Sequence, residues 1–277
     1  MLDVFSQDPF CGNPLAAVFD ADELSTDEMQ HLTRWFNLSE TVFFQKPSHP
    51  EADYKVRIFT LNRELPFAGH PTLGSCQAWL TAGGKPKRDA VVVQECGAGL
   101  IHIQQTDDRL AFAAPDMLRS GAVSDDELDK ICNILGIGRK DIKASNWIDN
   151  GPGWVGLLLE SAEKVLSIKA NATPDDIFDI GIIGPYPKGS ECDFELRALF
   201  SVPDDGLRED PVTGSLNASM AQWLMGTGHA PDTYVASQGT LLQRKGRIYL
   251  ERDKSGQVWV GGHSTVRVKG EIELADL

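Results

Sequence analysis

Two segments of the chain are apolar around nearly their whole circumference, and each follows a turn rich in proline and glycine. Residues 73–80 follow the sequence ELPFAGHPT and end before a pair of glycines, while residues 216–225 follow EDPVTGS and end at a glycine. A helix that is apolar on every side is typical of a buried position. The pattern therefore predicts two helices inside the protein, each entered through a sharp turn.

Shorter patterns around these helices predict amphipathic helices and strands. Capping boxes of the form Ser-x-x-Glu begin helices at Ser25 and at Ser124, because serine and glutamate together satisfy free N–H groups of a first turn. The first of these helices runs to about residue 36 and turns Met29, Leu32, Phe36 and Trp35 inward. Strands are expected at residues 3–5, 15–19, 52–60, 90–94, 100–104, 110–112, 143–147, 155–159, 194–200, 234–237, 247–251, 258–260 and 265–274.

The order of these elements predicts an α+β protein of two similar domains. Helices and strands do not alternate as in a doubly wound sheet, so mainly antiparallel sheets are expected, each around one buried helix. The pattern starts again after residue 114, which gives domains 1–114 and 115–264, with the last strand, 265–277, returning to the first domain. The letters GS and QAWL in one buried helix, and GS and AQWL in the other, indicate a weak internal repeat.

Composition and charge limit the class of partner. A hydrophobic content of 42% and a charged content of 24% are typical of a soluble globular protein. The net charge of −14 and the lack of a basic cluster argue against nucleic acid and anionic membranes as partners. We find no signal peptide and no apolar run near the ~20 residues of a membrane span, so a cytoplasmic protein is expected. Five cysteines without paired spacing predict free thiols, and neither a disulfide framework nor a zinc site.

The turns before the two buried helices carry the candidate chemistry. His70 follows Gly69 at the start of the first helix, where unpaired N–H groups and a partial positive charge can hold a small anion. A histidine that only caps a core helix explains this stretch equally well. Asp210 precedes the second helix in the same way, which favours two helices pointing their N-termini at one shared cleft. Glu40 lies at the mouth of an apolar strand, where it is either a proton carrier or simply solvated.

Several short motifs together resemble the phenazine-biosynthesis PhzF-like isomerase family. They are GNP at residues 12–14, NLSET at 37–41, ELPFAGHPT at 64–72, EDPVTGS at 209–215, QG at 238–239 and GG at 261–262. The resemblance covers nearly the whole chain in the same order. It implies the diaminopimelate-epimerase-like fold, in which two domains each curl a sheet around a central helix and share an interdomain active site. It also implies an isomerase that needs no cofactor or metal, acts on a small carboxylate and forms a homodimer.

The resemblance also implies roles for individual residues. Glu40 is the acid/base group that carries a proton from one carbon of the substrate to another, and His70 and Asp210 orient the substrate or assist the transfer. The best-known family member isomerises a dihydro-hydroxyanthranilate on the way to phenazines. Negative charge that develops during proton removal is stabilised by N–H groups at a helix start. The implied substrate-binding residues are Ser39, Gly69, Gly214 and Ser215.

Departures from the family pattern leave alternatives open. Epimerases of the same fold use one cysteine at each helix start, and no thiol lies at either start here, which disfavours two-thiol racemisation. Asn217 replaces a histidine common in the family, and only two residues precede Asp3, so either a short edge strand or another start site is expected. These two features support a non-catalytic carboxylate-binding protein as the alternative. A cysteine hydrolase using Cys11 or Cys76 lacks a recognisable His/Asp arrangement.

Overall fold

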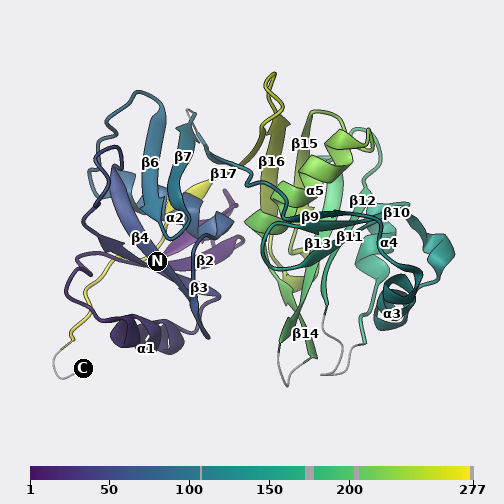
Figure 1. Cartoon of the computed structure of the whole chain (residues 1–277), viewed down its shortest axis with the longest axis horizontal. Coiled ribbons are helices and arrows are strands. Elements are labelled where there is room, and N and C mark those ends of the chain that lie inside the picture. The colour runs from purple at the N-terminus through teal and green to yellow at the C-terminus, as the bar shows by residue number, and fades with distance from the viewer. Residues whose placement is uncertain (107, 172–177, 203–205, 275–277) are drawn as a thin grey trace. The chain divides into compact units, whose positions relative to one another are not determined.

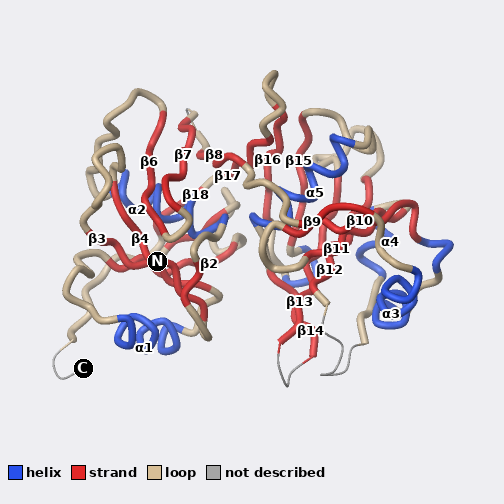
Figure 2. Tube along the Cα trace, in the orientation of Figure 1, coloured by secondary structure: helices blue, strands red, loops and turns tan. Residues whose placement is uncertain are grey.

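The structure is a computed structural model that describes residues 1–106, 108–171, 178–202 and 206–274 (Figure 1). The chain forms two compact units. Unit 1 comprises Met1–Ala113 and the chain from Gly261 onward, and unit 2 comprises Ala114–Val260. Strands predominate and helices are few, as Figure 2 shows. The strands pair both antiparallel and parallel, so the predicted α+β class is confirmed.

Unit 1 curls a sheet around helix α2. Neighbouring strands pair in the order β18, β1, β2, β3, β4, β6, β7, β8, and only β2–β3 and β4–β6 among these pairs are parallel within the described residues. The elements are β1 (Leu2–Val4), β2 (Asn13–Val18), α1 (Thr26–Phe36), β3 (Glu40–Gln45), β4 (Tyr54–Thr60), β5 (Glu64–Leu65), α2 (Gly69–Thr81), β6 (Val91–Cys96), β7 (Gly99–Gln105), β8 (Leu110–Ala113) and β18 (Ser264–Val266).

Unit 2 repeats this plan around helix α5. One hydrophobic cluster of unit 2 contains buried apolar side chains of α3, β10, β11, β12 and β13. The elements are β9 (Arg119–Gly121), α3 (Asp125–Leu135), η1 (Arg139–Asp141), β10 (Ile142–Asp149), β11 (Trp154–Leu159), α4 (Ala162–Ser167), β12 (Asp179–Pro185), β13 (Phe194–Val202), β14 (Gly206–Asp210), α5 (Gly214–Gly226), β15 (Thr233–Gln238), η2 (Thr240–Leu242), β16 (Gly246–Arg252) and β17 (Val258–Gly262), which leads back into unit 1.

The two units have the same order of elements and the same strand pairings. The series β1-β2-α1-β3-β4-β5-α2-β6-β7 corresponds to β10-β11-α4-β12-β13-β14-α5-β15-β16. In each series the first two strands are antiparallel, the strands that flank the first helix are parallel, and the strands that flank the hairpin and central helix are parallel. The weak repeat seen in the sequence is therefore confirmed as a repeat of topology.

Both central helices are buried, as their apolar circumference predicts. Helix α2 approaches strands β1 and β2 closely at Gly74. A Cβ atom there would lie 2.4 Å from Leu15 Cδ2 and 2.9 Å from Val4 Cγ2. Both neighbours are fully buried, so neither has room to move. Glycine at this position is therefore required by packing, although it is a poor helix former.

We expect Gly74→Ala to lower the free energy of unfolding by about 1–3 kcal/mol, because the added methyl group overpacks the core. Gly226→Ala is the matched control, since Gly226 ends the other central helix and nothing lies within 4 Å of its added Cβ. That variant should be neutral or gain up to about 1 kcal/mol. Urea denaturation followed by circular dichroism measures both. Equal stability of the two variants would contradict the packing argument.

Local signals in the sequence predicted the amphipathic helices correctly. Ser25 and Ser124 cap α1 and α3, and both form complete capping boxes. The inward orientation of Trp35 was wrong, since this side chain is 75% exposed and packs edge-on against Phe36. No described helix has the length and apolarity needed to cross a membrane.

The terminal strands differ from expectation. The predicted strand at 265–274 is shorter: β18 ends at Val266, and residues 275–277 lie outside the described residues. Strand β1 is paired on both sides, with β2 and β18, so it is not an edge strand, which was one of the two alternatives expected. The return of the chain to unit 1 therefore rests on a three-residue ladder from Leu2↔Val266 to Val4↔Ser264.

Strand β12 and helix α4 were not predicted from the sequence. The β12 sequence, DIGIIGP, contains two glycines that resemble turn positions. In the structure they allow close packing instead: a Cβ at Gly181 would lie 2.4 Å from Leu216 Cδ1 on α5, and one at Gly184 would lie 2.4 Å from Ser161 O. Glycine in a strand can mark a close approach as well as a break.

Candidate active site

The predicted residues of unit 1 meet at the start of α2. The helix begins at Gly69, and β3 begins at Glu40. His70 is buried, and its Nε2 lies 3.6 Å from Glu40 Oε2. Among the described residues, this Nε2 has no hydrogen-bond partner at normal distance. A buried polar atom without a partner is unusual in a folded protein and calls for an explanation, which a bound substrate would supply.

The GNP motif lies against the same histidine. The Asn13 side-chain amide lies 3.4 Å from His70 Nδ1. Asp3 fixes the preceding turn by accepting hydrogen bonds from the backbone N–H groups of Cys11 (3.1 Å) and Gly12 (2.8 Å). A Cβ at Gly12 would lie 2.2 Å from the Val4 carbonyl oxygen, so only glycine fits.

Burial controls the charge of His70. Removal from water lowers the pKa of the imidazole to about 3, although a hydrogen bond to the Pro14 backbone acts in the opposite direction. The ring is therefore neutral near pH 7. A neutral imidazole has one N–H donor and one lone-pair acceptor, so it can serve as either hydrogen-bond partner but is not a store of positive charge.

We expect this histidine to make stability fall in acid. In the unfolded chain its pKa returns to about 6.5, so between pH 6.5 and about 3 the unfolded state binds a proton that the folded state does not. The contribution is complete above pH 6.5 and is lost as the pH falls. Between pH 7 and pH 5 this group should remove about 2 kcal/mol from the free energy of unfolding.

Urea denaturation at pH 7 and pH 5 tests this, with His70→Gln expected to lose that part of the pH dependence. His31→Gln is the control, because His31 is exposed on α1 and should leave the dependence as in the parent. An unchanged difference between pH 7 and pH 5 in His70→Gln would mean that His70 is not the buried neutral group described above.

Helix α2 offers its N-terminus without a side-chain cap. Ala68 is the N-cap residue and has no polar side chain, so the backbone N–H groups of Gly69 and His70 are not capped by it. The first N–H groups of any helix have no partner within the helix. Gly69, one of the predicted substrate-binding residues, is therefore the first residue of this helix. Ser39 lies exposed in the turn between α1 and β3, directly before Glu40.

The predicted residues of unit 2 meet at the start of α5. Asp210 is the last residue of β14, and Thr213 is the N-cap residue before Gly214. The Thr213 hydroxyl donates a short hydrogen bond to Asp210 Oδ2. Ser215, half-buried in the first turn, accepts a hydrogen bond at its carbonyl from Asn150 Nδ2 (2.8 Å).

The structure accounts for Asn217. Its Nδ2 donates to the Thr213 carbonyl (2.9 Å) and to Gln238 Oε1 (2.8 Å). Both contacts lie within the first turn of α5 and the strand beside it, so the amide fastens the helix start. Gln238 and Thr213 were not selected from the sequence as functional residues. Thr213 stood within the EDPVTGS motif and Gln238 within the QG dipeptide at 238–239, but neither residue was given a role of its own.

Cysteine chemistry does not fit the described thiols. All five cysteines are free. Cys76 is buried inside α2, and burial raises its pKa well above the usual thiol range, so the reactive thiolate is disfavoured. Cys11 Sγ donates to the Pro9 carbonyl (3.4 Å). Among the described residues, no three His, Cys, Asp or Glu side chains gather as a metal site would require.

Two polar cavities are lined by residues other than the predicted ones. One, of about 390 Å³, is lined in unit 1 by residues that include Thr106, Asp108 and Arg109, and another, of about 300 Å³, is lined in unit 2 by residues that include Arg197 and Glu209. Neither is lined by any of the predicted site residues.

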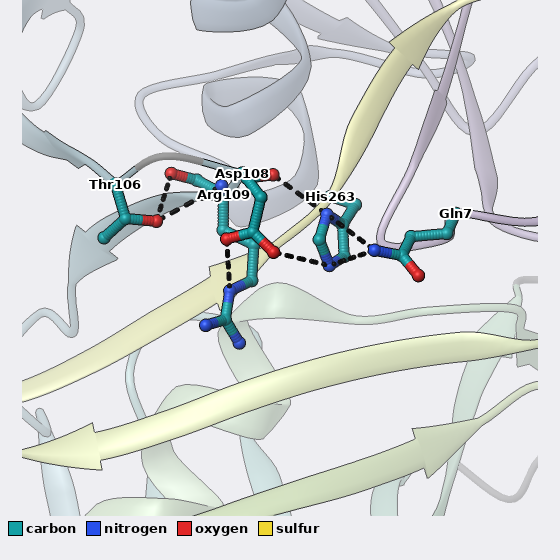
Figure 3. Close-up of polar contacts among 5 residues, drawn as sticks. All are labelled: Gln7, Thr106, Asp108, Arg109 and His263. Carbon is teal, nitrogen blue, oxygen red and sulfur yellow. Dashed lines mark hydrogen bonds and ion pairs between the residues drawn. The ribbon is translucent and has the colours of Figure 1, made fainter.

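Figure 3 shows a second polar cluster. Three of its residues, Thr106, Asp108 and Arg109, also line the larger cavity. His263 lies between Gln7 Nε2, 3.0 Å from its Nε2, and the Asp108 carbonyl, 2.9 Å from its Nδ1. The Thr106 hydroxyl donates to the Arg109 carbonyl and closes the adjoining turn. Burial lowers the pKa of His263. These contacts tie the β18 end of unit 1 to the β7–β8 turn, which is a structural role.

Comparison with solved structures identifies the fold. The chain aligns with a crystal structure from Enterococcus faecalis, described as a phenazine biosynthesis protein of the PhzF family, with a TM-score of 0.79. The alignment covers 99% of this chain and 97% of that one at 22% identity. The predicted diaminopimelate-epimerase-like fold is therefore confirmed.

Relatives identify the class and the family. The chain is 40% identical to the trans-2,3-dihydro-3-hydroxyanthranilate isomerase of Pseudomonas aeruginosa, covering 99% of this chain and 98% of that one. It is 34% identical to antisense-enhancing sequence 1 of Schizosaccharomyces pombe, covering 98% and 96%. The class is that of the isomerases, and the protein is an enzyme. The chain belongs to the phenazine biosynthesis-like protein family, PhzC-PhzF, whose model matches residues 2–270.

Proposed function

We propose that this isomerase moves a proton between two carbons of a small carboxylate substrate by general acid/base catalysis, without a cofactor. The observation that carries the proposal is the Glu40 carboxylate, 3.6 Å from the buried His70 Nε2 at an uncapped helix start. Catalytic hydrogen bonds are often long before substrate binds and tighten in the complex. The named isomerase relative favours this proposal over a non-catalytic carboxylate binder.

Glu40 carries the proton in two steps. Its carboxylate takes H⁺ from a substrate carbon, and the electron pair of the broken C–H bond moves into the conjugated or carboxylate system of the substrate. The Glu40 carboxylic acid then gives the same proton to a second carbon as the electron pair forms the new C–H bond. No oxidant, reductant or net proton is consumed. A carboxyl group in such a position contributes about 10²–10⁴-fold to the rate.

His70 assists this transfer in its neutral form. Because its pKa is about 3, the ring neither competes for the proton near pH 7 nor places a permanent positive charge beside Glu40. It can exchange a hydrogen bond with Glu40 or with the substrate as the carboxyl group changes between its two forms. This keeps the proton available to be delivered, where a fixed ion pair would hold the carboxyl group ionised.

Asp210 orients the substrate, and backbone and side-chain donors bind its carboxylate. The proposed binding groups are the N–H groups at Gly69 and Gly214 together with the Ser39 and Ser215 hydroxyls. The positive ends of α2 and α5 support an anion at these positions. A homodimer and a cytoplasmic location belong to the same proposal, and light scattering after gel filtration measures the first.

Solvent deuterium incorporation tests the proposal. The parent protein is incubated in D₂O with trans-2,3-dihydro-3-hydroxyanthranilate and with a panel of small cyclic and amino-substituted carboxylic acids. Mass spectrometry and NMR then locate any deuterium. We expect incorporation or isomerisation with at least one compound, with no cofactor added. Binding of a compound by calorimetry, with no exchange on any of them, would favour a protein that only binds carboxylates.

A further inference from the structure

The side chain of Gln238 is the centre of a buried network at the start of α5. Gln238 is the last residue of β15 and is fully buried. Its Oε1 accepts hydrogen bonds from the Thr213 backbone N–H (3.0 Å) and from Asn217 Nδ2 (2.8 Å). Its Nε2 donates to the Asp210 carbonyl (3.1 Å) and to Thr213 Oγ1 (2.9 Å). We call these four residues the Gln238 network.

These hydrogen bonds connect the Gln238 amide, through the Thr213 hydroxyl, to the Asp210 carboxylate. An amide oxygen can accept two hydrogen bonds and an amide NH₂ can donate two, so the Gln238 amide is used to capacity. Thr213 Oγ1 accepts from Gln238 Nε2, and the threonine hydroxyl donates its own proton to Asp210 Oδ2. The same glutamine therefore holds the backbone of Asp210 directly and its carboxylate through Thr213.

Close backbone packing makes the network rigid. Gly239 adopts a φ of 89°, and a Cβ there would lie 2.5 Å from the Pro211 carbonyl oxygen. A Cβ at Gly246, opposite Gln238 in the β15–β16 ladder, would lie 2.6 Å from Val212 Cγ2. Because both positions are glycine, the end of β15 packs closely against the segment between Asp210 and α5. This gives the QG dipeptide a physical reason.

Unit 1 has a related glutamine, but the threonine that it contacts does not donate to an acidic side chain in the described contacts. Gln94 on β6 is also fully buried, and its Nε2 donates to Thr72 Oγ1 in the first turn of α2 (3.2 Å). The Thr72 hydroxyl, however, donates to the carbonyl of the N-cap residue Ala68 (2.8 Å), four residues earlier in the chain. A glutamine that fastens the first helical turn thus occurs in both units. Among these described contacts, only the threonine hydroxyl of unit 2 donates a hydrogen bond to a carboxylate.

We propose that Thr213 and Gln238 are positioning residues that hold the Asp210 carboxylate in one orientation for the reaction. This inference rests on the proposed function, because the proposed function is what assigns Asp210 a role with the substrate. Thr213 is the residue to change, because its hydroxyl can be removed without changing the shape of the side chain. A misplacement of about 1 Å in a positioned group can lower a rate about 10²-fold.

The experiment compares Thr213→Val, which removes the hydroxyl, with Thr213→Ser, which keeps it. Thr227→Val is the matched control, because Thr227 follows the other end of α5 and its hydroxyl donates to the Trp223 carbonyl (2.8 Å). Deuterium exchange into trans-2,3-dihydro-3-hydroxyanthranilate gives kcat and KM, and crystal structures give the Asp210 side-chain conformation. Thr213→Ala provides a second hydroxyl-free variant where valine does not fold.

We expect Thr213→Val to lower kcat about 10- to 100-fold with a smaller change in KM, and to show more than one Asp210 conformer. Thr213→Ser should stay within about threefold of the parent, and Thr227→Val should match it, because positioning acts through Asp210 and not through stability. A single, unchanged Asp210 conformer in Thr213→Val would overturn the inference and leave the proposed function standing. If the parent catalyses no exchange on any compound of the panel described above, the proposed function fails, and the Asp210 conformers alone still decide the inference.

Discussion

Glu40→Gln should lower the rate of proton exchange about 10³-fold while the protein stays folded. Glutamine has nearly the shape of glutamate, but its amide neither takes nor releases a proton near pH 7. Glu40 begins β3 in a ladder that runs from Glu40↔Thr60 to Gln45↔Lys55, and this backbone pairing does not depend on the carboxylate. Because His70 is neutral, removing the Glu40 charge breaks no ion pair with this histidine. The loss should therefore appear in kcat and not in the unfolding transition.

Two further variants give this prediction its control. Glu40→Asp keeps the acid but shortens the side chain, so it should retain more activity than Glu40→Gln. Glu64→Gln removes a carboxylate in the same unit that pairs with Arg57 at 2.6 Å and is partly exposed, and it should leave exchange unchanged. Deuterium incorporation measured by mass spectrometry separates the three. Exchange by Glu40→Gln at the parent rate would remove Glu40 from the mechanism.

Arg197→Leu should lower the free energy of unfolding by about 3–5 kcal/mol, because it leaves a buried carboxylate without its partner. Arg197 and Glu209 are joined by two parallel hydrogen bonds, Nε to Oε1 at 3.1 Å and Nη2 to Oε2 at 2.8 Å. Their side chains are only 6% and 11% exposed. Arg197 Nη1 also donates to the carbonyls of Val165 (3.2 Å) and Ile168 (2.8 Å) at the end of α4.

Unit 1 contains the matched control for this pair. Arg57 and Glu64 lie at the corresponding places on β4 and β5 and use the same atoms, with Nε to Oε1 at 2.8 Å and Nη2 to Oε2 at 2.6 Å. Their side chains are 22% and 38% exposed, so water screens the charges and replaces a lost partner. Arg57→Leu should therefore lower the free energy of unfolding by about 1 kcal/mol or less.

Urea denaturation of both variants compares one interaction at two depths of burial. Adding Glu209→Gln to Arg197→Leu should recover part of the lost stability, because the unpaired charge is then removed. Equal losses in Arg57→Leu and Arg197→Leu would mean that burial does not set the strength of the pair. Glu209 of the buried pair directly precedes Asp210 in the chain. Loss of the pair is therefore expected to disturb the start of α5 as well.

Local signals explain what was predicted correctly. A capping box needs only four consecutive residues, so Ser25 and Ser124 marked their helices without knowledge of the rest of the fold. The all-round apolar character of α2 and α5 marked them as buried, since no side of either helix suits water. The motifs around Glu40, His70 and Asp210 marked the candidate site, and the roles of these residues stay predictions until the exchange experiments are made.

Contacts between distant segments explain what was missed. The glycines of β12 resemble turn residues until α5 is packed against them, and Trp35 is apolar yet faces water. The two Arg–Glu pairs have the same chemistry, but their sequence separations are 7 and 12 residues, so nothing local relates them. Their correspondence becomes visible only when β4 is matched with β13 in the repeated topology.

The sequence by itself determined the α+β class, the two central helices and the types of residue at their starts, because periodicity, capping and turn chemistry act over a few neighbouring residues. Only the tertiary structure decided that His70 is neutral, since its pKa depends on burial by segments far away in the chain. It also decided that Gln238 holds Thr213 and Asp210 across separations of 25 and 28 residues. Desolvation and long-range hydrogen bonding arise from the folded packing, and no local pattern encodes them.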